Sequence, residues 1–327
     1  MKHAIALIAA LWAAPVVADV ARSVDTYILP SYAALAESTA RLRDQAGVDC
    51  APAAVRPAWN AAFDDWLHVS PIHFGPVEQD GRAVIIAFWP DGRSAGPRAL
   101  ARLIAEEDPI ISTAEGTAKL SAAARGFYAL EHLLFDAQFV DTTAYSCDLI
   151  RAVTADLAHM SADIEDAWMT GYAESLRSAG ATGNETFLSE REGIQILFTS
   201  LLAGLEFTAD TRLGRPLGSF ENPRPKRAES WRSGRSLRNV SLSLQGLQAL
   251  KNTLSDLETP VTDAGFERAF TLIAQLDDPV LAGVADPQSR LKIEVLQQAV
   301  KSIKEAAEVE LSALLGVEAG FNAADGD

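Results

Sequence analysis

The sequence has few of the residues that usually catalyse reactions or bind transition metals. Its 327 residues include two cysteines and five histidines, and no two histidines lie four positions apart. This spacing excludes an H-E-x-x-H zinc helix. The chain also has no glycine-rich phosphate-binding loop. The common sequence signatures of zinc peptidases and nucleotide-binding proteins are therefore missing.

Basic residues are scarce as well. The chain has 28 Lys and Arg against 44 Asp and Glu, which gives a formal net charge of −16. Such a surface repels nucleic acid and anionic lipid and attracts cations, including metal ions, so we predict no nucleic-acid partner. The basic residues that cluster locally are Arg224, Lys226, Arg227, Arg232, Arg235 and Arg238. The cluster has three interpretations: a solvated loop, a clamp for an anion or carboxylate, and, favoured here, pairing with nearby acids.

Long apolar runs are limited to the N-terminus. After Lys2 the chain is uncharged and apolar until a small-residue end at Ala18. This pattern predicts a secretory signal peptide over residues 1–18 that is cleaved near Ala18. The run is too short to span a bilayer. We expect a periplasmic or secreted protein whose mature chain has no transmembrane segment.

The two cysteines are Cys50 and Cys147. An even number of cysteines in an exported protein favours a disulfide, and only one pairing is available. The bridge would tie the end of the first mature helix to the helix after the central motif. Two free buried thiols are the alternative.

The remaining pattern is helical. About nine segments carry apolar residues at helical spacing, with little sign of strands, so the predicted class is all-α. Long helices with short loops pack as antiparallel bundles. A stretch rich in small and polar residues, 178–185, predicts a boundary between an N-terminal bundle (19–180) and a C-terminal bundle (181–327). Ala129-Leu130-Glu131 and Gly204-Leu205-Glu206 faintly repeat each other across it.

The most informative stretch is 126–135, within a helix predicted over 117–135. At about 100° per residue, Tyr128, Glu131 and His132 fall on one face of an otherwise apolar helix. Residues three and four apart are helical neighbours, so an acid, an imidazole and a phenol here can share a ligand. The alternative is a satisfied polar spot in a helical core.

This stretch resembles a family motif. Gly126-Phe127-Tyr128-Ala129-Leu130-Glu131 is similar to the G-x-H-x-x-E motif of the imelysin family, with Tyr128 at the His position. Other blocks resemble that family in the same order: Trp59 to Trp66, Phe74 to Glu78, Phe88-Trp89-Pro90, and Glu229 to Ser236, which is similar to E-S-x-x-S-x-x-S. The resemblance covers essentially the whole mature chain.

The resemblance implies a fold and a function. It implies two pseudo-related antiparallel helical bundles with a pocket between them, exported to the cell envelope. It also implies a link to bacterial iron uptake, with an envelope iron-transport system as a partner, and a historical label as a metallopeptidase. Because Tyr128 replaces the motif His, peptidase activity is disfavoured, and Glu131 would be the catalytic residue if peptides are cleaved. A non-catalytic envelope interaction protein is the second alternative.

We therefore expect a ligand site in the pocket. Phenolate and carboxylate are hard oxygen donors, which suit ferric iron better than a soft-ligand site. The predicted site binds iron, another divalent or trivalent metal, or a small ligand through Tyr128, Glu131, His132 and Glu78. The predicted supporting residues are Gly126, Ser230, Arg232 and Ser233. Two simpler interpretations stay open, that Glu78 only caps a turn and that the serines only cap a helix.

Overall fold

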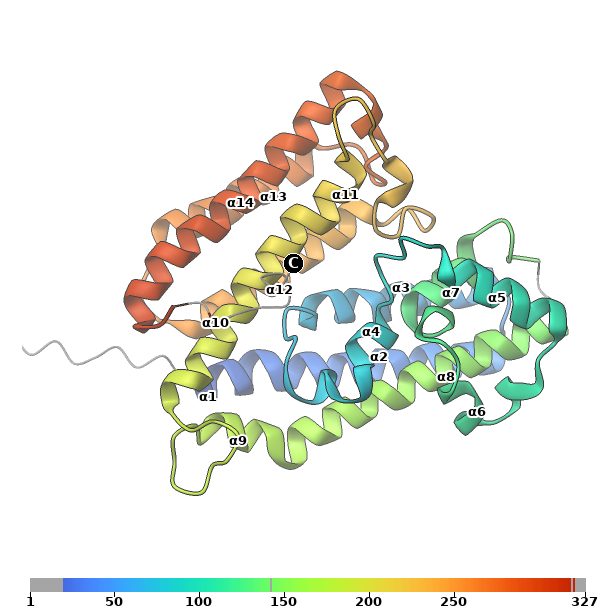
Figure 1. Cartoon of the computed structure of the whole chain (residues 1–327), viewed down its shortest axis with the longest axis horizontal. Helices are drawn as coiled ribbons and strands as arrows, with labels where there is room; N and C mark the ends of the chain where they lie inside the picture. Colours follow the sequence, from blue (N-terminus) through green and yellow to red (C-terminus); the bar gives the residue numbers. More distant parts are fainter. Residues whose placement is uncertain (1–19, 142, 319, 321–327) are drawn as a thin grey trace, which may run out of the picture.

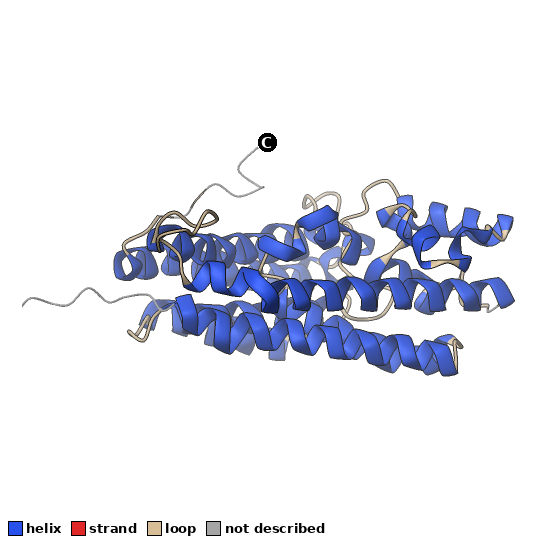
Figure 2. Ribbon diagram, turned by 90° about the horizontal axis from the view of Figure 1, so that it is seen from below, coloured by secondary structure: helices blue, strands red, loops and turns tan. Residues whose placement is uncertain are grey.

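The computed structural model describes residues 20–141, 143–318 and 320. The predicted signal peptide lies outside these residues. The fold is all-α, and the described residues form no strand (Figure 2). The helices are α1 (Val20–Ser23), α2 (Leu29–Val48), α3 (Pro52–Val69), α4 (Arg82–Ile86), α5 (Ala95–Glu106), α6 (Ala114–Ala118), α7 (Gly126–Phe135), α8 (Ala144–Ala167), α9 (Ala173–Arg177), α10 (Glu190–Glu206), α11 (Gly214–Leu217), α12 (Ser236–Leu254), α13 (Pro260–Gln275) and α14 (Pro287–Leu315).

Two groups of helices make up the body. In the first, α2 packs against α3 and α8, and α7 packs against the same two helices. In the second, α10 packs against α12 and α14, and α13 packs along α14 (Figure 1). Helix α12 also contacts α3, and one continuous apolar core runs through both groups. The division into two domains near residue 180, which falls in the loop between α9 and α10, stays a prediction.

A disulfide braces the first group. It joins Cys50, directly after α2, to Cys147 in the first turn of α8, with the two Cα atoms 5.4 Å apart. This bridge fixes one end of the packed α2–α8 pair. No helix among the described residues is long and apolar enough to cross a membrane.

The helix predicted over 117–135 is broken in the structure. Helix α6 ends at Ala118, a 3-10 turn spans Ala122–Ala124, and α7 begins at Gly126. Gly126 has a φ of +69°, a left-handed conformation that favours glycine. A Cβ on Gly126 would lie 2.2 Å from the carbonyl oxygen of Ile85 and 2.4 Å from that of Ile86. The close approach of α4 therefore sets the start of α7.

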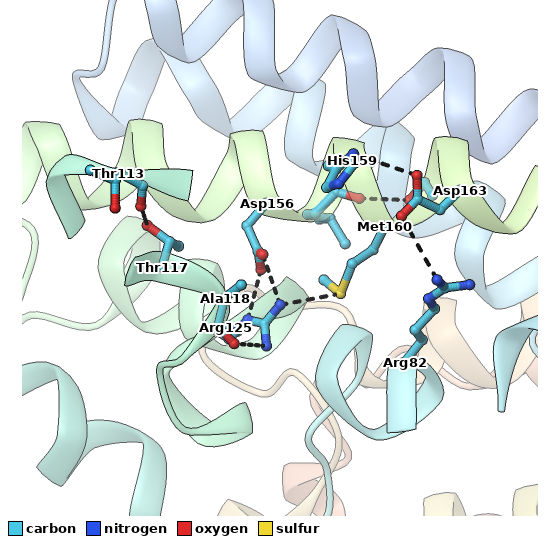
Figure 3. Close-up of polar contacts among 11 residues, drawn as sticks. Arg82, Thr113, Thr117, Ala118, Arg125, Asp156, His159, Met160 and Asp163 are labelled. Carbon is cyan, nitrogen blue, oxygen red and sulfur yellow. Dashed lines mark hydrogen bonds and ion pairs between the residues drawn. The ribbon is translucent and has the colours of Figure 1, made fainter. Parts of the chain in front are cut away.

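The residue before this glycine is anchored to α8. Figure 3 shows the Arg125 guanidinium facing Asp156, with Nε 2.8 Å and Nη2 2.7 Å from its two carboxylate oxygens. Arg125 also donates to the backbone oxygen of Ala118, 2.9 Å away. Both charged side chains are only 7% exposed. A two-pronged buried ion pair is directional, so it fixes where α7 starts and which face it turns inward.

Candidate functional site

A cavity of about 240 Å³ lies beside the polar face of α7. Tyr128, Glu131 and His132 line one wall. The second wall is formed by the segment 88–97, and the third by residues 226–228 and 230–232 together with Arg215. The sequence brings the first wall together because positions 128, 131 and 132 share a helical face. Only the tertiary fold adds the other two walls.

Glu131 is buried, with 3% of its surface exposed. Its Oε1 accepts two hydrogen bonds from Ser233, one from the backbone N at 3.1 Å and one from Oγ at 2.8 Å. Burial raises the pKa of Glu131 to about 7, although the Ser233 bonds and the nearby Arg232 act to lower it. Oε2 makes no hydrogen bond to the described residues. Glu131 therefore carries an available oxygen and changes charge near neutral pH.

Tyr128 is already engaged inside the protein. Its hydroxyl donates a hydrogen bond to Oε1 of Glu229, whose Oε2 accepts from Nε of Arg212 at 2.8 Å. Burial, and secondly the charge of Glu229, raise the pKa of Tyr128 well above its ordinary value. The side chain is thus a neutral phenol rather than the phenolate that the sequence hypothesis used. No sequence pattern pointed to Arg212, and Glu229 lay in a family block without an assigned role.

His132 is oriented by the acid one turn later. Its Nδ1 lies 3.2 Å from Oδ2 of Asp136, which also accepts a hydrogen bond from Nε of Arg232 at 2.7 Å. Burial, and secondly Arg232, lower the pKa of His132, so the ring is neutral at neutral pH. An imidazole that donates Nδ1–H to a carboxylate presents a lone pair on Nε2, as metal-binding histidines commonly do. Sequence reasoning missed Asp136, although its spacing of i, i+4 from His132 was readable.

Most of the predicted site residues line the cavity, and two others support it from outside. Tyr128, Glu131, His132, Ser230 and Arg232 all line the cavity. Ser233 supports Glu131, and Gly126 starts α7, as described above.

Glu78 lies elsewhere, which corrects the expectation that it joins the site. Its side chain is 50% exposed, its Oε1 is 3.6 Å from Nδ1 of His73, and it does not line the cavity. The short 3-10 turn Gly75–Val77 directs it to the surface instead. The described residues contain no group of three or more His, Cys, Asp or Glu arranged to hold a metal ion.

The six basic residues clustered between positions 224 and 238 have different surroundings. Arg232 pairs with Asp136, and both Arg235 and Arg238 pair with Asp64. The predicted pairing with acids therefore holds for half of the cluster. Lys226 and Arg227 make no such pair. They line the cavity together with Arg232 and with Arg215, which the sequence did not single out.

Comparisons with known proteins give one consistent result. A family model described as Imelysin matches residues 28–307. Iron-regulated protein A of Synechococcus elongatus is 22% identical over 320 residues, covering 89% of this chain and 85% of the relative. The crystal structure of an imelysin-like protein from Psychrobacter arcticum superposes with a TM-score of 0.77 at 19% identity, covering 94% of this chain and 100% of the other. At that identity the structural likeness shows the fold alone.

Proposed function

The chain belongs to the imelysin family, and we propose that it is an exported protein that binds an iron-bearing ligand in the cavity beside α7. The name of the cyanobacterial relative, an iron-regulated protein, supports a role connected with iron. Export rests on the sequence pattern of residues 1–18. The expected partner is an envelope iron-transport system.

One observation carries the proposal. Glu131 Oε2 and the His132 Nε2 lone pair are the two donor atoms on this cavity wall that the described residues leave without a hydrogen bond. Carboxylate oxygen and imidazole nitrogen are both ligands that iron accepts. The Tyr128 hydroxyl is held by Glu229, so we assign it to positioning α7 rather than to the iron.

Two protein donors do not fill the coordination sphere of iron. The remaining positions would be taken by donors that the ligand brings with it, so the cargo is better described as an iron chelate than as a bare ion. This donor count also favours binding over peptide hydrolysis. A metallopeptidase usually needs three protein ligands, an activated water and a general base.

Iron titration of the purified mature protein tests the proposal. Ferric citrate is added to wild type, Glu131→Ala and His132→Ala, and binding is followed by tryptophan fluorescence and by iron content after gel filtration. Loss of one donor is expected to weaken binding about tenfold or more. Glu206→Ala is the matched control, because Glu206 lies outside the cavity.

Equal iron binding by wild type and Glu131→Ala would refute the site. Chelator-sensitive cleavage of a peptide substrate that disappears in Glu131→Ala would instead establish the metallopeptidase function.

A further inference from the structure

The wall of the cavity formed by Arg215 and residues 226–232 is unusually basic for this protein. The chain carries a net charge of −16, yet the cavity is lined by four basic side chains and two acidic ones. The basic residues are Arg215, Lys226, Arg227 and Arg232, and the acids are Asp91 and Glu131. Charge of the opposite sign to the whole protein, gathered in one cavity, attracts anions to that place.

Three of these cations have no acidic partner. Arg232 is neutralised by Asp136 at 2.7 Å. Arg215, Lys226 and Arg227, in contrast, make no ion pair and no side-chain hydrogen bond with any described residue. Lys226 only stacks over the ring of Trp231, with Nζ 5.6 Å from its centroid. Lys226 and Arg227 are exposed, so leaving them unpaired costs little, whereas Arg215 is half-buried.

Among the three unpaired cations, Arg215 is in the least favourable environment. Its Nε is buried and has no hydrogen-bond partner within the described part of the chain. A buried donor without an acceptor is unfavourable, because it has lost its hydrogen bonds to water and gained none in the protein. Burial, and secondly the neighbouring charge of Arg227, lower the pKa of Arg215. An anion placed between the two guanidinium groups would offset both the missing bond and the repulsion.

Ser230 provides a second, independent sign of a ligand. It lines the same cavity, is 2% exposed, and its Oγ has no hydrogen-bond partner among the described residues. Its φ of +50° is a left-handed conformation that is unfavourable for a residue with a side chain. An unpartnered buried hydroxyl held in a strained backbone is typical of a functional position.

We propose that Arg215, Lys226, Arg227 and Ser230 form an anion subsite that binds the oxyanion groups of a small multivalent ligand, a carboxylate or a phosphate. This deepens the proposed function and rests on it for the iron: the same ligand would present its anionic groups to this wall and its metal to Glu131 and His132. The cavity of about 240 Å³ is smaller than the roughly 300–1,000 Å³ of typical ligand pockets, so it fits a small ligand.

The two acids of the cavity do not oppose such a ligand strongly. The carboxylate of Asp91 accepts hydrogen bonds from the backbone N of Ala95 at 2.9 Å and of Gly96 at 2.8 Å, so its charge is stabilised at the start of α5. Oε1 of Glu131 accepts hydrogen bonds from the backbone N of Ser233 at 3.1 Å and from its Oγ at 2.8 Å, so its charge is stabilised as well.

Anion binding without iron tests the subsite separately from the proposed function. Metal-free mature protein is titrated calorimetrically with citrate and, in a second series, with pyrophosphate. Wild type is expected to bind one of the two, and the preferred anion identifies the oxyanion class. Arg227→Gln is expected to weaken binding about tenfold, the loss of one charge-assisted contact, and Arg215→Gln by at least as much.

The controls separate this site from general charge and from the iron site. Arg224→Gln removes an exposed arginine of the same segment that does not line the cavity, and it should bind the anion like wild type. Arg215 is half-buried, so Arg215→Gln also changes packing, and the exposed Arg227 therefore carries the decisive comparison. The proposal is overturned if wild type binds neither anion, or if Arg227→Gln and Arg224→Gln behave alike. Neither result would affect the outcome of the iron titration. Conversely, wild type could bind the anion even if the iron titration showed no binding.

Discussion

The helices α7 and α10 carry the same three-residue pattern, a small residue followed by Leu and Glu. Leu130 and Leu205 are both fully buried, so the two helices use the pattern alike for packing. The acids differ. Glu131 is 3% exposed and is covered by the loop that carries Ser233. The Glu206 side chain is 27% exposed and pairs with Lys304 of α14.

The difference shows what converts an acidic residue into a site. Both glutamates stand one residue after a core leucine, so the helical pattern does not distinguish them. The loop 229–233 removes water from Glu131 and brings no full counter-charge to it, which raises its pKa to about 7. The Glu206 side chain, in contrast, stays accessible to water and pairs with Lys304. The raised pKa of Glu131 therefore comes from burial by a loop that is distant in the sequence, and not from the helix that carries the residue.

Breaking the buried ion pair behind α7 should have the largest effect. Arg212→Met removes the guanidinium that pairs with Glu229, and both side chains are almost fully buried, at 6% and 3% exposed. We expect a loss of about 3–5 kcal/mol in the free energy of unfolding, because an uncompensated charge stays buried. Lys301→Met removes an exposed partner of Asp210 near α10 and should cost about 0–1 kcal/mol. Urea unfolding measures both, and equal losses would remove the contrast between the two regions.

Gly126→Ala tests how tightly α7 is positioned. The new Cβ would overlap the carbonyl oxygens of Ile85 and Ile86 and force a left-handed conformation on alanine. We expect a loss of about 3 kcal/mol in thermal or urea unfolding. In α10, Gly204→Ala would meet only the flexible end of Leu247, at 2.5 Å, and should change stability by about 1 kcal/mol or less. A Gly126→Ala variant as stable as the Gly204→Ala variant would show that α4 does not set the start of α7.

The pH dependence of stability should distinguish the two glutamates. The folded pKa of Glu131, about 7, exceeds the ordinary value of 4.5 for a glutamate, so the folded state holds the proton more tightly than the unfolded state. Its contribution is fully favourable below about pH 4.5 and is lost as the pH rises to about 7. Compared with Glu131→Gln, metal-free wild type should lose up to about 3 kcal/mol across this window. Glu206→Gln should keep the wild-type slope, and a Glu131→Gln variant with that same slope would contradict the assignment.

Tyr128→Phe should have the smallest effect of the four. It removes one hydrogen bond to Glu229 but leaves that acid its bond to Arg212. We expect a loss of about 2 kcal/mol in urea unfolding and little change in iron binding, since Tyr128 is assigned to positioning. Tyr145→Phe loses a bond to the backbone oxygen of Asp108 at a half-buried position and should cost about 1 kcal/mol or less. A tenfold loss of iron affinity in Tyr128→Phe would instead make the phenol a ligand.

The sequence by itself determined the local features of this protein. The spacing of apolar residues predicted the all-α class, and the family blocks predicted membership in a family that the comparison with known proteins then confirmed. The common face of Tyr128, Glu131 and His132 also followed from residue spacing alone, because helical geometry is periodic.

Only the tertiary structure decided what those residues do. It placed Glu229 and Arg212 behind Tyr128, covered Glu131 with the 229–233 loop, and left Glu78 at the surface. It also divided the basic cluster: Arg235 and Arg238 pair with Asp64, whereas Lys226 and Arg227 line the cavity without an acidic partner. The contacts of Tyr128 and Glu131 with the 229–233 loop join residues about 100 positions apart, and they set burial and charge pairing. Burial and pairing fix a group's pKa and its freedom to bind, and neither can be read from spacing along the chain.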